Sequence, residues 1–261
     1  MRTSLVIGAS SAIAQAVIAQ LLNDKLNQNK AKAEHNKVIA VSRQAMPQSL
    51  APFLANGQLT WRQSDYQQAS IQALLTELFA TLSVTHSKDQ RQLSEIIICN
   101  GILHSEDFMP EKKIEAFEPS AFDQVLSANT LTPLRWLQAL MPYLEHYQAP
   151  CFVTVMSARI GSISDNQLGG WYSYRMSKAA LNMAVKCLAI EASRRAKHVK
   201  FILFHPGTTD TPLSKPFQRN VRKDKLFTPA FVATQLLSAK HHVELDGQAS
   251  YLDWQHKVIP W

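Results

Sequence analysis

Seven short apolar runs recur along the chain, and longer segments with helical spacing of their apolar residues separate them. The runs span residues 3–8, 37–42, 59–63, 95–100, 151–156, 199–204 and 249–254. The intervening segments of helical periodicity or length span residues 11–24, 68–83, 119–146, 171–195 and 229–240. Nearly all-apolar strands that alternate with helices indicate a parallel sheet covered on both faces.

We therefore predict an α/β fold in which residues 1–261 form a single doubly wound domain of the Rossmann type. Its sheet is mostly parallel and seven-stranded, with helices on both faces. The sequence contains no internal repeat, low-complexity tract or linker that would divide it. The polar stretches Asn27–Asn36 and Thr85–Arg91 are predicted to be solvated surface loops.

The composition agrees with a cytoplasmic enzyme. With 261 residues, 46% of them hydrophobic, the chain can bury one large core. Cys99 and Cys151 stand in apolar runs, so we expect buried, reduced thiols. The sequence has no run of about 18 apolar residues, so it predicts no membrane span. A secretory signal over residues 1–22 is the alternative for the N-terminus, although several polar residues interrupt its apolar stretch.

The net charge of +7 permits anionic partners. Because the lysines and arginines are dispersed, steering of a phosphate-bearing cofactor explains this charge better than binding of nucleic acid. None of the nine histidines stands in a metal-ligand pattern, and the sequence has no Gly-x-Ser-x-Gly hydrolase elbow.

The first apolar run leads through a tight turn into a helix. Such a turn directs free backbone amides and the positive end of a helix dipole toward an anion such as a pyrophosphate. We therefore predict that this segment binds a dinucleotide through Gly8, Ser10, Ser11, Ala12 and Ile13. Ala12 and Ala14 stand where a glycine-rich turn has its other glycines, and their methyl groups could crowd the cofactor or the helix packing.

Polar residues also follow the next strands, at the sheet edge where ligands of such folds bind. Ser42 and Arg43 follow the second strand, and an arginine there can pair with a 2′-phosphate, which favours NADP(H) over NAD(H). An ordinary solvated arginine is the alternative. Asp65 and Tyr66 follow the third strand; Asp65 is expected either to bind the adenine or to cap a helix or turn. Asn100-Gly101 follows the fourth strand and suits a sharp turn beside the cofactor.

Tyr174 and Lys178 stand four residues apart in a predicted helix, so they lie on one face, one turn apart. An ammonium beside a phenol favours the phenolate, so the sequence predicts a lowered tyrosine pKa and a general acid for carbonyl reduction. Ser157 ends the fifth apolar run and is favoured over Ser162 and Ser164 as the hydroxyl that reaches the same edge.

Together these residues resemble the short-chain dehydrogenase/reductase family. The family-type positions appear in order as Gly8, Asp65, Asn100-Gly101, Asn129, Ser157, Tyr174, Lys178, Pro206-Gly207 and Thr211. Within the family, the chain most resembles the C-factor-like and sniffer-type carbonyl reductase branch. That likeness rests on the stretches 169–174, 205–207 and 259–261.

The resemblance implies a role for each site residue. Tyr174 protonates the substrate oxygen as hydride arrives, and Lys178 lowers the pKa of Tyr174 and binds the nicotinamide ribose. Ser157 binds the carbonyl oxygen, and Asn129 holds a water that links Lys178 to solvent. The carboxamide of the nicotinamide is expected to contact the segment that contains Pro206, Gly207, Thr209 and Thr211.

The resemblance thus implies an NADP(H)-dependent oxidoreductase that reduces an aldehyde or ketone, or catalyses the reverse reaction. Loops 102–118 and 210–228 are expected to shape the substrate pocket, in which Trp171, Phe217 and residues 251–254 are candidate apolar contacts; His104 is expected to be exposed. The alternative function is a non-catalytic dinucleotide-binding signalling or redox-sensing protein of the C-factor type. The family often forms homodimers or homotetramers, so either assembly is expected here, although some members are monomers.

Overall fold

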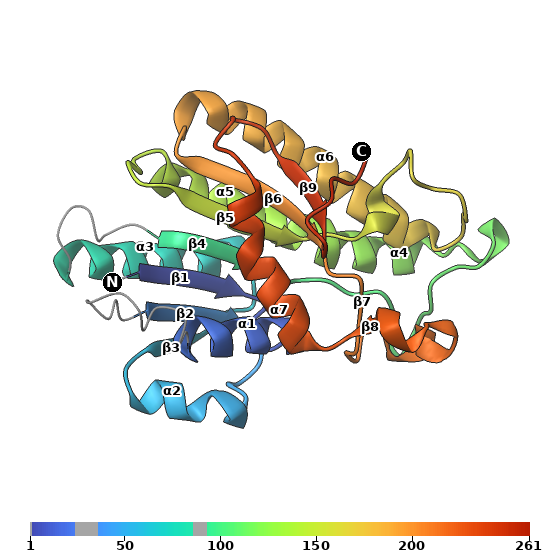
Figure 1. Cartoon of the computed structure of the whole chain (residues 1–261), viewed down its shortest axis with the longest axis horizontal. Coiled ribbons are helices and arrows are strands. Elements are labelled where there is room, and N and C mark those ends of the chain that lie inside the picture. The colour runs from blue at the N-terminus through green and yellow to red at the C-terminus, as the bar shows by residue number, and fades with distance from the viewer. Residues whose placement is uncertain (1, 24–35, 86–92) are drawn as a thin grey trace.

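The computed structural model describes residues 2–23, 36–85 and 93–261, and its centre is one seven-stranded sheet (Figure 1). The strand order is β3-β2-β1-β4-β5-β6-β9, and every neighbouring pair is parallel. The strands are β1 (Arg2–Ile7), β2 (Asn36–Ser42), β3 (Leu59–Gln63), β4 (Leu93–Ile98), β5 (Cys151–Met156), β6 (Val199–His205) and β9 (Ser250–Asp253). The predicted doubly wound sheet is confirmed.

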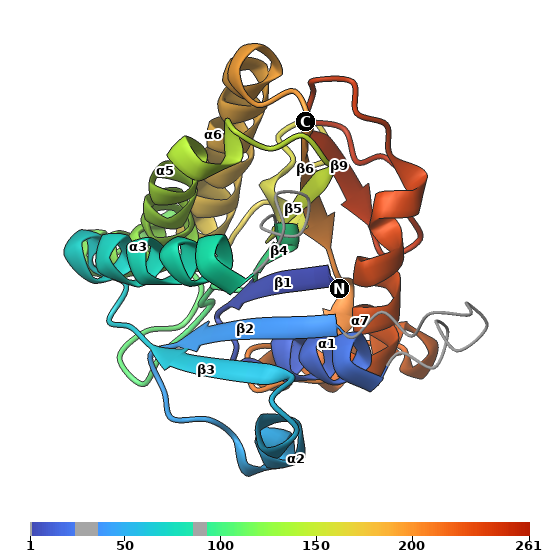
Figure 2. The same ribbon diagram turned by 90° about the vertical axis from the view of Figure 1, so that its left-hand side faces the viewer.

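Helices cover both faces of this sheet, as Figure 2 shows. One face carries α1 (Ala12–Asn23) and α7 (Pro229–Ser238); the other carries α3 (Gln68–Thr85), α5 (Thr132–Leu144) and α6 (Tyr172–Arg195). The short helix α2 (Ala51–Ala55), absent from the sequence prediction, connects β2 to β3. Alternating strand side chains feed two apolar cores, so Leu5 and Ile7 join α3, α5 and α6, whereas Val6 joins α1 and α7.

The single helix predicted for residues 119–146 is interrupted at its centre. It consists of α4 (Pro119–Leu126), a π-helical turn η5 (Ser127–Leu131) and α5. The backbone N–H and the hydroxyl of Thr132 both donate to the carbonyl of Ser127, which widens the turn. Asn129 and Thr130 of this turn are buried. Single π turns of this kind are frequent at functional sites.

The segment after β6 is folded rather than an open loop. Thr208–Thr209 (β7) pairs with Leu226–Phe227 (β8), and the 3₁₀ helices η7 (Lys215–Asn220) and η8 (Lys223–Lys225) lie between them. The loops predicted at residues 27–36 and 85–91 fall mostly outside the described residues; Asn36 begins β2 and Thr85 ends α3. Within the described residues, no helix has the length and apolar character needed to cross a bilayer.

Candidate active site

A cavity of about 490 Å³ opens at the carboxyl ends of the strands. Its size lies in the range of small-molecule and cofactor sites. Most of the residues predicted to bind the cofactor line it: Gly8, Ser10, Ser11, Ala12, Ile13, Ser42, Arg43, Tyr66, Asn100, Gly101, Lys178, Pro206 and Thr211. Ser157 and Tyr174 line it too, whereas Asp65, Asn129, Gly207 and Thr209 do not. The cavity thus brings together residues that are up to about 200 positions apart in the sequence.

The first turn of α1 offers donors to this cavity. Ser11 caps the helix, because its Oγ accepts from the backbone N–H of Ala14 at 3.3 Å. No described residue accepts a hydrogen bond from the amides of Ala12 or Ile13, which begin the helix. Two free amides at a helix N-terminus suit an anionic group such as a pyrophosphate.

The alanines that replace the expected glycines fit the chain's own packing. Ala14 is fully buried in the core formed with α7, and Ala12 lines the cavity at the helix start. Gly8 cannot be replaced in this way. Its φ is +77°, and a Cβ there would lie 2.9 Å from the carbonyl carbon of Cys99.

Arg43, Ser42 and Tyr66 form one end of the cavity. The Arg43 guanidinium lies 5.8 Å from the centre of the Tyr66 ring. Tyr66 is fixed there because its hydroxyl donates to the carbonyl of Val41 and accepts from the N–H of Gly8, both at 3.2 Å. The backbone of Tyr66 has φ of +64°, a conformation that costs energy for a non-glycine residue and clusters at functional sites.

Asp65 closes the turn before helix α3 and does not line the cavity. Its carboxylate accepts from the backbone N–H of Gln67 at 2.9 Å. That bond, with a second from the Ser70 hydroxyl, lowers the pKa of Asp65 below its usual value. The structure therefore shows Asp65 as a turn cap, and its contact with an adenine stays a prediction.

Tyr174 and Lys178 share one face of α6, as predicted. The Lys178 ammonium lies 5.9 Å from the centre of the Tyr174 ring and donates to the carbonyl of Met156 at 2.9 Å. Lys178 is only 3% exposed, so its amino group is buried at the carboxyl end of β5. The spacing in the sequence therefore places both groups at the cavity wall.

The Tyr174 pKa is raised in this structure, not lowered as the sequence predicts. Burial, and then the neighbouring Tyr251, raise the pKa of Tyr174 well above its usual value. Burial also lowers the pKa of Lys178 to about 8, so its ammonium loses its proton more readily than that of an exposed lysine. The Lys178 ammonium donates to the carbonyl of Met156, and burial dominates the pKa of Tyr174.

Ser157 lies at the carboxyl end of β5 and is buried. Its hydroxyl donates to Oδ1 of Asn182 at 2.6 Å. Asn182 lies two helical turns after Tyr174 in α6. It was not identified from the sequence, although an asparagine inside an apolar helix face is a visible signal. The alternatives are engaged elsewhere: Ser162 accepts from the N–H of Asp165, and Ser164 donates to the carbonyl of Trp261.

Asn129 is fully buried in the π turn and links three segments. Its Oδ1 accepts from the N–H of Ile102 at 2.7 Å, and its Nδ2 donates to the carbonyl of Ile102 and to Oγ of Ser177. Ser177 stands directly before Lys178 in α6. Asn129 therefore ties the loop after β4 to the helix that carries Tyr174 and Lys178, while its proposed contact with a water remains a prediction.

The structure explains Gly207 differently from the sequence. Gly207 has φ of +71°, and a Cβ there would lie 2.6 Å from the Phe227 ring and 3.0 Å from Trp254. Its glycine is therefore required by packing within the chain. Thr209 is buried in β7 and its hydroxyl bonds to no described residue, whereas Pro206 and Thr211 border the cavity.

The N-terminus of α6 is capped from a distance. Trp171, which precedes the helix, has a left-handed backbone (φ +53°) and gives no side-chain cap. Instead the carboxylate of Glu111, from the 102–118 loop, accepts from the hydroxyl and the backbone N–H of Ser173. A buried carboxylate thus stabilises the helix turn that presents Tyr174, and this residue was not identified from the sequence.

Three aromatic side chains gather next to Tyr174. Phe217 of η7 lies 4.9 Å from Trp171 and 5.7 Å from His104, measured between ring centres, and Trp171 lies 6.4 Å from Tyr174. His104 was expected to be exposed, but it is half-buried and its Nε2 has no hydrogen-bond partner among the described residues. Tyr251 is buried and Trp254 packs against Phe227, so these two belong to the fold's interior.

The sequence profile described as short chain dehydrogenase matches residues 2–222. The chain therefore belongs to the short-chain dehydrogenase/reductase family of oxidoreductases. It is 33% identical over 118 residues to 1-hydroxy-2-glutathionyl-2-methyl-3-butene dehydrogenase from Rhodococcus sp. (strain AD45), a match that covers 45% of this chain and 50% of that protein. It is 30% identical to C-signal from Myxococcus xanthus over 138 residues, 53% of this chain and 77% of C-signal.

Solved structures agree with the fold. NADPH-bound carbonyl reductase from chicken fatty liver superposes with a TM-score of 0.79 at 23% identity, over 100% of this chain and 99% of that one. Carbonyl reductase Sniffer of D. melanogaster gives a TM-score of 0.79 at 19% identity over 100% of both chains. These structures confirm the fold of the family, and the match to C-signal agrees with the resemblance to the C-factor-like branch.

Proposed function

We propose that this protein is an NADP(H)-dependent reductase of aldehydes or ketones, or the corresponding alcohol dehydrogenase. One observation carries the proposal: a single cavity joins the free amides of α1, the Arg43 guanidinium, and the side chains of Ser157, Tyr174 and Lys178. The first two suit phosphates and the last three suit a carbonyl, so cofactor and substrate chemistry meet in one space.

The residues present fit a nicotinamide dinucleotide. The amides of Ala12 and Ile13 would hold the pyrophosphate, and Arg43 would pair with the 2′-phosphate above Tyr66. Oδ1 of Asn100 is buried beside the cavity without a hydrogen-bond partner among the described residues, so it would accept from a cofactor hydroxyl. When bound, the reduced nicotinamide supplies the hydride.

The protein's own groups would manage the proton. The Ser157 hydroxyl would turn its proton from Oδ1 of Asn182 to the carbonyl oxygen and hold that oxygen beside Tyr174. Tyr174 would then give its proton to that oxygen as negative charge develops there. Lys178 would stabilise the resulting phenolate, and the loss of bulk water would strengthen this attraction. The substrate's apolar part would lie toward Trp171 and Phe217.

A titration of the protein's tryptophan fluorescence with NADPH and with NADH tests the proposal. We expect energy transfer to bound nicotinamide, with micromolar affinity for NADPH and clearly weaker affinity for NADH. A panel of aldehydes and ketones then tests turnover. If neither cofactor binds, the proposal fails.

The 30% sequence identity to C-signal supports a second candidate function, that of a dinucleotide-binding signalling or redox-sensing protein. Such a protein would bind NADPH without consuming it with any carbonyl tested. It would also keep its function when Tyr174 is replaced by phenylalanine, whereas a reductase would not.

A further inference from the structure

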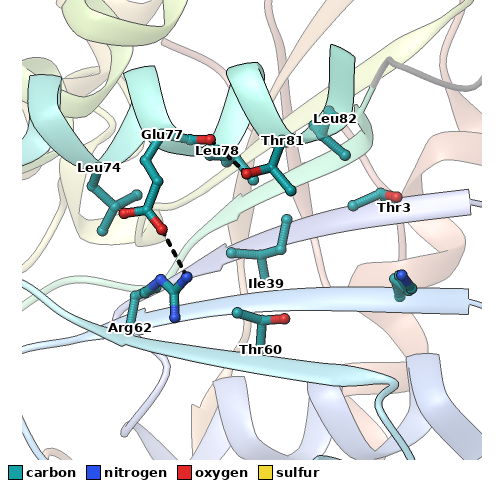
Figure 3. Close-up of a pocket in the computed structure, with 10 residues that line it drawn as sticks. Thr3, Ile39, Thr60, Arg62, Leu74, Glu77, Leu78, Thr81 and Leu82 are labelled. Atoms are coloured by element: carbon teal, nitrogen blue, oxygen red, sulfur yellow. Dashed lines mark hydrogen bonds and ion pairs between the residues drawn. The ribbon is translucent and has the colours of Figure 1, made fainter. Parts of the chain in front are cut away.

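A second cavity, of about 180 Å³, lies on the α3 side of the sheet. It separates helix α3 from strands β1, β2 and β3 (Figure 3). Its lining combines aliphatic, hydroxyl and charged side chains: Thr3, Lys37, Ile39, Thr60, Arg62, Leu74, Glu77, Leu78, Thr81 and Leu82. This volume equals that of about six liquid water molecules, at about 30 Å³ each, so the cavity can hold a small organic molecule.

The sequence pattern builds this cavity. Residues 74, 77, 78, 81 and 82 follow helical spacing and turn one face of α3 toward the sheet. Below them, Thr3 pairs in register with Lys37, and Ile39 pairs with Thr60. Ile39 of the sheet and Leu78 and Leu82 of the helix supply apolar lining to the cavity.

The two ends of the cavity differ. At one end, Arg62 and Glu77 form an ion pair at 2.9 Å, so both charges are already compensated (Figure 3). At the other end, the Lys37 side chain forms no ion pair with any described residue. Four residues along β2 separate Lys37 from the level of Arg62, about 13 Å at about 3.3 Å per residue.

Thr3 provides the second observation at the Lys37 end. It is only 2% exposed, and its hydroxyl has no hydrogen-bond partner within the part of the chain that the structure describes. A buried hydroxyl without a partner is costly, and such groups in native proteins call for an explanation. A ligand oxygen that accepts from this hydroxyl while it pairs with the Lys37 ammonium satisfies both groups.

We propose that the groove between α3 and strands β1–β3 is a second ligand site, which binds a short-chain aliphatic carboxylate. The carboxylate contacts Lys37 and Thr3, and the aliphatic chain lies along Ile39, Leu78 and Leu82. The Arg62–Glu77 pair closes the far end and limits the length of the chain. The site shares no lining residue with the active-site cavity.

Hexanoate is the probe, and the methyl resonances of Ile39, Leu74 and Leu78 report its position. We expect saturable shifts of these resonances, with acetate and 1-hexanol binding at least about fivefold more weakly because each lacks one half of the recognition. Shifts confined to methyl groups of the active-site cavity, such as Ile13 and Met156, would overturn the proposal. So would the absence of any shift.

Three variants locate the interaction. Lys37→Gln is expected to raise the hexanoate Kd about tenfold, as loss of a charged hydrogen bond does, whereas Lys197→Gln, an exposed lysine at the same end of the sheet, leaves it unchanged. Thr60→Phe places a ring in the groove from an exposed edge position and abolishes the shifts. Thr3→Val weakens binding and does not lower the Tm of the free protein. Equal binding by Lys37→Gln and the wild type would refute the site.

Discussion

The two halves of the active-site cavity are built from different parts of the polypeptide. The half near α1 presents mainly backbone: the amides of Ala12 and Ile13 and the turn at Gly8. The half near α6 presents buried side chains that hold one another, as Ser157 does with Asn182 and Asn129 does with Ser177. A backbone site tolerates changes of side chain, whereas a side-chain site loses its function with one atom. We therefore expect the half near α1 to tolerate its alanines better than the half near α6 tolerates the loss of its polar residues.

The largest expected effect is in the side-chain half. Tyr174→Phe removes the proton donor and is expected to lower kcat by about 10²–10⁴-fold while NADPH still binds. Tyr172→Phe is the matched control, because Met176 rather than a lysine follows it by four residues. Steady-state reduction and the fluorescence titration measure both quantities. Retained turnover in Tyr174→Phe would remove Tyr174 from the mechanism.

The second effect concerns the stability of the free protein. Burial lowers the pKa of Lys178 from 10.5 to about 8. Between these values the unfolded chain holds a proton that the folded chain lacks, so the free energy of unfolding increases with pH. Below pH 8 the folded protein bears the full cost of burying the ammonium, on the order of 3 kcal/mol. Urea unfolding of wild type and Lys178→Met from pH 7 to 10.5 measures this. We expect the stability advantage of Lys178→Met to shrink as pH rises; a constant difference would contradict the shift.

The third effect lies at the cofactor's phosphate. Arg43→Ala is expected to raise the Kd for NADPH about tenfold to a hundredfold, as loss of a charge-assisted hydrogen bond does, and to leave the Kd for NADH nearly unchanged. Arg43→Lys keeps the charge and should recover part of the affinity. Equal losses for both cofactors would show that Arg43 does not distinguish them.

The smallest effect is expected in the backbone half. Ala12→Gly should change the Kd for NADPH by less than about threefold, because the pyrophosphate is held by amides that remain in place. Ala14→Gly should destabilise the protein by about 0.5–1 kcal/mol, since it adds backbone freedom inside a helix. A rise in affinity above tenfold in Ala12→Gly would mean that the methyl group obstructs the cofactor.

The sequence predicted the sheet and the arrangement of Tyr174, Lys178 and Ser157, because apolar strands and helical spacing are local patterns. It did not predict the break at Ser127–Leu131, which depends on the hydrogen bonds of one threonine. Nor did it reveal Glu111 or Asn182, whose partners lie 62 and 25 residues away. The predicted direction of the Tyr174 pKa shift was wrong for a related reason, because the spacing places a lysine nearby but carries no information on burial.

Glu111 also bears on how this protein could acquire new substrates. The carboxylate that caps α6 belongs to the same loop that is expected to shape the substrate pocket. Insertions or exchanges in that loop, whether in evolution or in enzyme engineering, must therefore keep Glu111 opposite Ser173. Otherwise a change made to alter selectivity would also disturb the helix that presents Tyr174. One anchored position thus limits how freely the rest of the loop can diversify.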